Sequence, residues 1–134
     1  MPLSESELWE KVRAVWRKGR IFYSLVQGRR YTMIFLDEDR RHCVFEYESN
    51  RQKSIPLTDL YAVYRELYKQ GCLPRAYFRD PENCLQVLGR RSWHAPGAAI
   101  YALLPLLDES IKVKEGGHLR VRGWKKGDGS IFLP

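Results

Sequence analysis

The sequence predicts a small α+β domain in which helices pack against an antiparallel sheet. Segment 20–48 contains three short runs rich in β-branched and aromatic residues, separated by two turns, which is typical of antiparallel strands. Segments 4–18, 57–70 and 96–107 instead repeat apolar residues every three or four positions, the spacing of one helix face. We therefore expect a sheet of at least three strands packed by about three helices.

The strands are expected at 21–26, 31–36 and 43–48. Gly28 permits a positive φ in the first turn, which favours a tight hairpin. The third strand alternates apolar and more polar residues, so one of its faces should pack on the core while the other meets water. Because the first two strands are apolar at both alternating positions, we expect them to be central and covered on both faces.

Local signals predict the ends of the helices. Ser4 is followed three residues later by a glutamate, which is capping-box spacing. Gly71 suits the end of the helix at 57–70. Asp80 and Pro81 have the residue types of a cap and a first helical position, so a short helix should begin there. Residues 49–53 are polar and basic and are expected to form a loop.

The chain changes character near residue 110. Residues 111–114 and 118–122 alternate apolar and basic side chains around a Glu-Gly-Gly turn, which predicts a hairpin. We interpret residues 1–134 as a single domain, with an α+β core at 1–109 and a basic, β-rich extension at 110–134.

Length and composition indicate a cytoplasmic protein. The 134 residues are 44% apolar, enough for one domain with its own core. No apolar run approaches the roughly 20 residues of a membrane span, and the polar N-terminus lacks the pattern of a secretory signal. Three cysteines cannot all pair, and their surroundings favour reduced, partly buried thiols.

The chain is basic, with a net charge of +7 and a pI near 9.5. The excess of Lys and Arg lies in residues 1–56 and 111–134, whereas 57–110 is balanced. A surplus of this kind fits a polyanionic partner, and a solvated basic surface is the alternative.

The candidate binding surface combines basic and aromatic residues. Arg29 and Arg30 lie at the tip of the first predicted hairpin, and a two-stranded ribbon can enter a major groove. Arg90 and Arg91 precede a predicted helix, whose free N–H groups attract anions. Further basic residues bracket a tryptophan in the Gly-rich tail, where the backbone can lie against phosphates. The full candidate set is Arg29, Arg30, Arg90, Arg91, Arg120, Arg122, Trp124, Lys125 and Lys126.

Catalytic patterns are sparse. The three histidines are scattered, and no Cys or His pair has zinc-finger spacing, so we expect neither a metal site nor a cofactor. Neither a nucleophile elbow nor a P-loop occurs. Asp37, Glu46 and Glu48 form the one carboxylate cluster of interest, since three carboxylates on neighbouring strands can hold Mg²⁺ for phosphodiester hydrolysis. A solvated strand face is the alternative interpretation of these residues.

Several of these segments resemble a known family. They are an aromatic-rich hairpin at 19–25 and 31–37, an Arg-Arg-Ser segment at 89–93 and an apolar helix at 99–107. Together they resemble a small domain of unassigned role that recurs in bacterial proteins associated with restriction and helicase functions. The resemblance spans residues 19–107, implies no catalytic residues and favours a DNA-associated role.

We therefore expect a non-catalytic protein that binds nucleic acid, with double-stranded DNA contacted through its phosphates. The first alternative is a protein-interaction module for an acidic partner or a larger enzyme. The second is a Mg²⁺-dependent nuclease that uses Asp37, Glu46 and Glu48.

Overall fold

The computed structural model describes residues 2–48, 50–92 and 97–121. It confirms the predicted α+β class, because these residues form an antiparallel sheet in the order β1-β2-β3-β4, a smaller sheet in the order β5-β7-β6, and four α-helices. None of the described helices is both long and apolar enough to cross a membrane. The helices are α1 (Glu5–Val15), α2 (Leu57–Gln70), α3 (Pro81–Leu88) and α4 (Gly97–Leu107), with a short 3-10 helix at Tyr77–Arg79. The strands are β1 (Ile21–Tyr23), β2 (Arg30–Asp37), β3 (His42–Tyr47), β4 (Arg51–Pro56), β5 (Cys72–Leu73), β6 (Ile111–Lys114) and β7 (His118–Val121).

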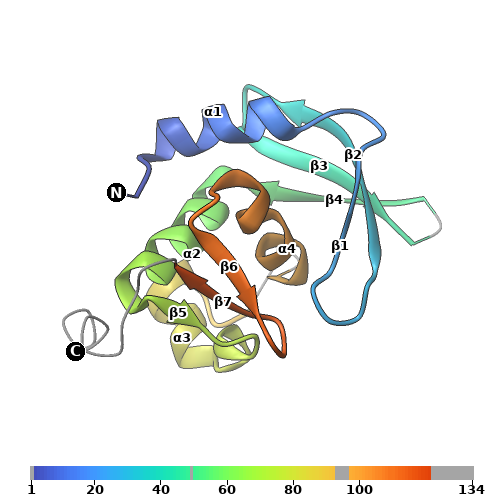
Figure 1. The fold of residues 1–134 in the computed structure, drawn as a ribbon. Helices are drawn as coiled ribbons and strands as arrows, with labels where there is room; N and C mark the ends of the chain where they lie inside the picture. The colour runs from blue at the N-terminus through green and yellow to red at the C-terminus, as the bar shows by residue number, and fades with distance from the viewer. Residues whose placement is uncertain (1, 49, 93–96, 122–134) are drawn as a thin grey trace.

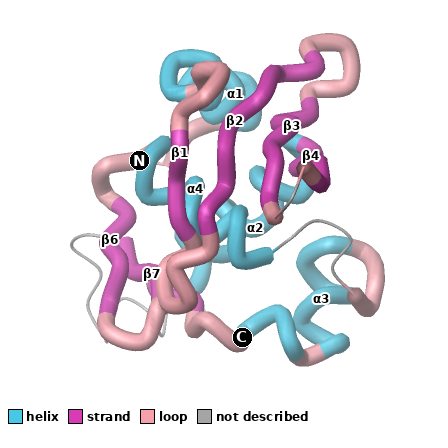
Figure 2. Tube along the Cα trace, turned by 90° about the vertical axis from the view of Figure 1, so that its right-hand side faces the viewer, coloured by secondary structure: helices cyan, strands magenta, loops and turns pink. Residues whose placement is uncertain are grey.

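Helices α2 and α4 form the centre of the molecule. Both contact both sheets, and α1 packs on both of them. Figure 1 shows α1 along the four-stranded sheet and the small sheet beside α2 and α4. In Figure 2, β1 and β2 lie in front of α2 and α4. The core is therefore built from one face of the four-stranded sheet, the helices and the inner face of the small sheet.

The predicted helix ends are confirmed. Ser4 and Glu7 form a reciprocal capping box, with each side chain accepting a hydrogen bond from the other's backbone N–H. Gly71 follows α2 with a φ of 80°, in the left-handed region that favours glycine. Asp80 caps α3 by accepting a hydrogen bond from the N–H of Glu82 at 2.9 Å. These signals are short in range, so the sequence alone identifies them.

The prediction that the first two strands are covered on both faces is wrong. Strand β1 lies at the edge of its sheet, where Ile21 is 42% and Tyr23 is 56% exposed. On β2, Phe35 is 50% exposed after a bulge that shifts the register between Met33 and Phe35. The helices cover one face of this sheet, and its other face carries these apolar side chains.

The predicted loop at 49–53 is also wrong. Arg51 begins β4, which pairs antiparallel with β3 so that Arg51 lies opposite Tyr47 and Ile55 opposite Cys43. An edge strand tolerates charged residues because part of it extends beyond the core into solvent. The ammonium of Lys53 lies 5.3 Å from the centre of the Tyr47 ring, so even this basic segment packs on the sheet.

Burial also determines the properties of the cysteines. Cys43 and Cys84 are buried, and Cys72 is half-buried. Burial raises the pKa of Cys43 to about 12, which keeps its thiol protonated at neutral pH. The Cys84 thiol donates a hydrogen bond to the carbonyl of Phe78 at 2.9 Å, and burial raises its pKa as well.

Substitution of Gly117, in the turn between β6 and β7, tests the contact between this turn and the loop after β1. Its φ is +80°, and a Cβ there would lie 2.5 Å from Cγ2 of Val26 in the loop after β1. We expect Gly117→Ala to lower the free energy of unfolding by about 2 to 3 kcal/mol, through left-handed strain and this overlap together.

The matched control is Gly28→Ala. Gly28 has a φ of +65° with nothing within 4 Å of the added Cβ, so it should cost only the strain of about 1 kcal/mol. Urea unfolding of both variants measures the difference. Equal losses would show that the turn and the loop are not in contact.

Candidate nucleic-acid interface

Arg90 holds helix α2 in place. Its guanidinium binds both carboxylate oxygens of Asp59, with Nη1 to Oδ1 at 3.2 Å and Nη2 to Oδ2 at 2.5 Å. Asp59 lies in the first turn of α2 and is only 7% exposed, so this is a largely buried, bidentate pair. The charge of Arg90 is therefore already matched by a carboxylate.

Three other arginines of the candidate set, Arg29, Arg30 and Arg91, lie near the start of β2 or after α3, and all three are exposed. Arg91 pairs with Glu82 at 3.1 Å, and Arg29 pairs with Glu48 at 3.7 Å. Arg30 lies directly opposite Tyr23 on the edge strand. Exposed pairs of this kind contribute little and exchange readily, so these charges remain accessible to an anion.

Arg120 lies in the middle of β7. It is directly opposite Cys72 of β5 on one side and Lys112 of β6 on the other. The structure does not bring it together with Arg29, Arg30, Arg90 and Arg91 by any described contact. Arg122, Trp124, Lys125 and Lys126 lie outside the described residues.

A basic surface on the small sheet consists of Lys112, Lys114, His118 and Arg120, which we call the basic ribbon. Lys112 lies opposite Arg120, and Lys114 opposite His118. The alternate β7 residues, Leu119 among them, are buried, so the basic side chains project from the outer face of the small sheet. Lys112 and Lys114 are exposed, so this face of the small sheet presents two ammonium groups to solvent.

Two further arginines lie at the turn of the basic ribbon. Arg75 and Arg79 line a hollow of about 270 Å³ together with Gly117 and the loop after β1. The backbone N–H of Arg75 donates a hydrogen bond to Nδ1 of His118 at 2.9 Å, which joins this hollow to the ribbon. Both arginine side chains are exposed, and neither forms an ion pair with another described residue.

Sequence reasoning missed Arg75, Arg79, Lys112 and Lys114 as candidates. The two arginines lie in a connector with no periodic pattern, and only the pairing of β5 with β7 places them beside the hairpin. The two lysines did carry a signal, because they occupy alternate positions of the predicted hairpin.

The three carboxylates of the nuclease alternative do not form one site. Asp37 Oδ1 accepts a hydrogen bond from the N–H of Arg40, in the turn after β2. Asp37 lies opposite His42, whereas Glu46 lies opposite Thr32, about 13 Å further along the strands. Within residues 2–48, 50–92 and 97–121, no three His, Cys, Asp or Glu side chains are grouped so that they could hold a metal ion.

Comparisons with known proteins do not identify a relative. No protein-family model, curated protein or solved structure matches this chain.

Proposed function

We propose that this protein binds nucleic acid, with double-stranded DNA as the preferred polymer, through phosphate contacts and without catalysis. The observation that carries the proposal is the facing of Lys112 and Arg120, and of Lys114 and His118, on the solvent side of the small sheet. The exposed ammonium groups of Lys112 and Lys114 would attract a phosphate placed beside this face.

The outer face of the small sheet can lie against a phosphate backbone. β7 is the middle strand of this three-stranded sheet, and Lys112 and Lys114 on β6 are exposed where they can contact the phosphates of a duplex. Arg75 and Arg79 extend the positive surface past the turn. Backbone contacts of this kind supply affinity and orientation without reading the base sequence. The resemblance of residues 19–107 to a restriction- and helicase-associated domain agrees with a DNA partner.

Charge reversal on the ribbon tests this proposal. We expect Lys112→Glu/Lys114→Glu to weaken binding to short duplex DNA by at least about tenfold and to reduce the salt slope by about 2, because two phosphate contacts are lost. Fluorescence anisotropy at several salt concentrations measures both quantities.

The matched control is Lys11→Glu/Lys18→Glu. These two exposed lysines lie on and just after α1, away from the ribbon, and the substitution changes the net charge by the same amount. The control should bind within about threefold of the parent, since only long-range repulsion is added. If the two double variants lost affinity equally, net charge alone would account for binding and the ribbon would not be the interface.

A further inference from the structure

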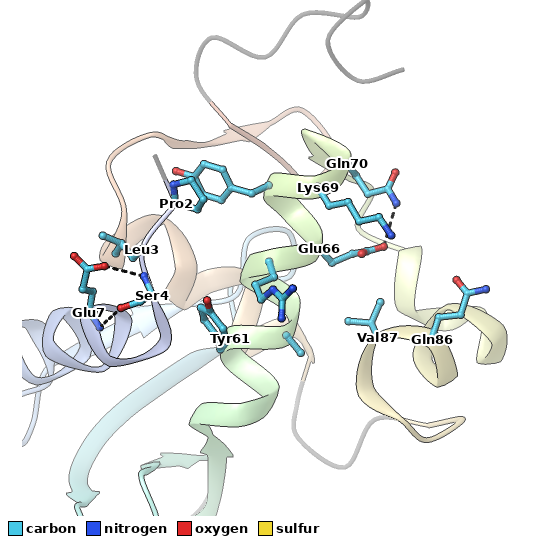
Figure 3. A pocket seen from close by; sticks show the side chains of 13 residues that line it. Pro2, Leu3, Ser4, Glu7, Tyr61, Glu66, Lys69, Gln70, Gln86 and Val87 are labelled. Atoms are coloured by element: carbon cyan, nitrogen blue, oxygen red, sulfur yellow. Dashed lines mark hydrogen bonds between the residues drawn. The ribbon is translucent and has the colours of Figure 1, made fainter. Parts of the chain in front are cut away.

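A second hollow lies on the surface of α2, and its lining residues are distant in sequence from those of the basic ribbon. Figure 3 shows Leu3 and the start of α1 on one side of α2, and Val87 of α3 on the other. The groove between them has a volume of about 880 Å³. Small-molecule sites commonly occupy roughly 300 to 1,000 Å³, so this groove is large enough for a metabolite.

The carboxylates of the groove are already engaged. Glu66 Oε2 accepts hydrogen bonds from the hydroxyl of Tyr77 at 2.6 Å and from the amide of Gln70 at 3.1 Å. Glu7 Oε1 accepts the backbone N–H of Ser4 at 3.0 Å, and the hydrogen bonds from Ser4 hold the pKa of Glu7 below its usual range. Both carboxylates keep their negative charge, and neither forms an ion pair with Arg65 or Lys69 among the described residues.

The cations of the groove lie on successive turns of α2. Arg65 and Lys69 are exposed, and neither forms an ion pair within the described part of the chain. The guanidinium carbon of Arg65 lies 5.9 Å from the centre of the Tyr61 ring. This contact pre-positions the guanidinium beside an aromatic surface. Tyr61, Arg65 and Lys69 therefore follow one another along the floor as a ring and two positive charges.

We infer that this groove binds a small anion built on a planar ring, that is, a ring that carries a phosphate or a carboxylate group. The ring packs against Tyr61 and the apolar wall at Leu3, and the anionic group lies between Arg65 and Lys69. A neutral ring would form no ion pair with Arg65 or Lys69, and a bare anion would make no packing contact with Tyr61. Both parts of the ligand are required for tight binding.

Binding of four probes to the full chain tests this inference. Adenosine monophosphate and 1-naphthoate each combine a ring with an anion, whereas adenosine lacks the anion and inorganic phosphate lacks the ring. Saturation-transfer NMR and calorimetry should show binding of at least one complete probe, and at least about tenfold weaker binding of the two partial ones. Adenosine monophosphate alone would indicate a nucleotide ligand, naphthoate alone an aromatic acid, and both would support the shared chemistry.

Substitutions in the groove test whether the probe binds there. Arg65→Ala/Lys69→Ala should weaken the bound probe by at least about tenfold, whereas Lys11→Ala/Lys18→Ala, with the same loss of charge, should stay within about twofold. Tyr61→Leu keeps the apolar bulk and should weaken the probe through loss of its aromatic face. Lys112→Glu/Lys114→Glu should leave the affinity unchanged, which separates this site from the DNA surface.

The inference fails if none of the four probes shows saturation transfer. It also fails if Arg65→Ala/Lys69→Ala and Tyr61→Leu both bind as the parent does, or if adenosine binds as tightly as adenosine monophosphate. Circular dichroism of each variant tests folding, which is expected to be kept because every substituted side chain lies at least partly at the surface.

Discussion

Replacing Arg90 with alanine is expected to lower the free energy of unfolding by about 3 kcal/mol. The substitution removes both hydrogen bonds to Asp59, whose carboxylate is only 7% exposed and would then be buried without its ionic partner. Water cannot fully replace the guanidinium at such a site, so the cost of burying the unpaired Asp59 carboxylate lowers the free energy of unfolding. The position of Asp59 in the first turn of α2 offsets only part of this cost.

The adjacent arginine is the control. Arg91 pairs with Glu82 in solvent, where the two side chains are 68% and 63% exposed, so Arg91→Ala should change stability by less than about 0.5 kcal/mol. Urea unfolding compares the two variants directly. Adding Asp59→Ala to Arg90→Ala should recover part of the loss, because no buried charge then remains unpaired. Similar losses for Arg90→Ala and Arg91→Ala would contradict the structural role given to Arg90.

The second large effect is expected at Asp108. Its Oδ2 accepts hydrogen bonds from the hydroxyls of Tyr64 at 2.9 Å and Tyr68 at 2.6 Å. The Tyr64 hydroxyl in turn accepts the backbone N–H of Leu3 at 2.8 Å, so this cluster joins the N-terminal segment, α2 and the end of α4. We expect Asp108→Ala to lower the free energy of unfolding by about 3 kcal/mol, because two hydroxyls lose a charged acceptor.

Asp108→Asn separates the hydrogen bonds from the charge. The amide oxygen keeps an acceptor in place, so the loss should be about half that of Asp108→Ala. Thermal or urea unfolding measures both variants at neutral pH. Negligible losses for both substitutions would show that the hydroxyls do not depend on this acceptor, and equal large losses would show that the charge, not the acceptor alone, is required.

The pH dependence of the free energy of unfolding tests the same cluster of Asp108, Tyr64 and Tyr68. Burial alone raises the pKa of Asp108, but hydrogen bonds from Tyr68, Ser110 and Tyr64 outweigh it, so the pKa lies below its ordinary value of 3.8. A lowered pKa in the folded state means that this stabilisation is fully present above pH 3.8 and is lost as the pH falls through the folded pKa. The free energy of unfolding of Asp108→Asn should not show this decrease as the pH falls, because its side chain does not titrate.

Much of the fold could be predicted because its signals are local. The capping box at Ser4, the glycine after α2 and the Asp-Pro start of α3 each act within one helical turn. Which strand lies at an edge depends on pairing between distant segments, and no local pattern reports it. The exposure of Ile21 and Tyr23 on β1 was therefore mispredicted.

In the candidate site, too, local features could be predicted and long-range contacts could not. The alternation of 111–114 with 118–122 predicted a basic hairpin, and β6 and β7 confirm it for the residues described. Arg90 has the same local sequence signal as Arg91, yet only Arg90 meets a buried carboxylate, thirty-one residues away in α2. Partners at that separation are set by packing, so the sequence could not distinguish a structural arginine from an accessible one.

The most direct test of the central proposal is a salt titration of the parent protein with duplex DNA, followed by fluorescence anisotropy. Contacts from Lys112, Lys114, Arg120, Arg75 and Arg79 predict a slope of about −4.5 for log Kobs against log salt concentration. Duplex DNA should also bind more tightly than a single strand of equal length. No binding at about 50 mM salt, or an affinity independent of salt, would contradict a phosphate-binding surface.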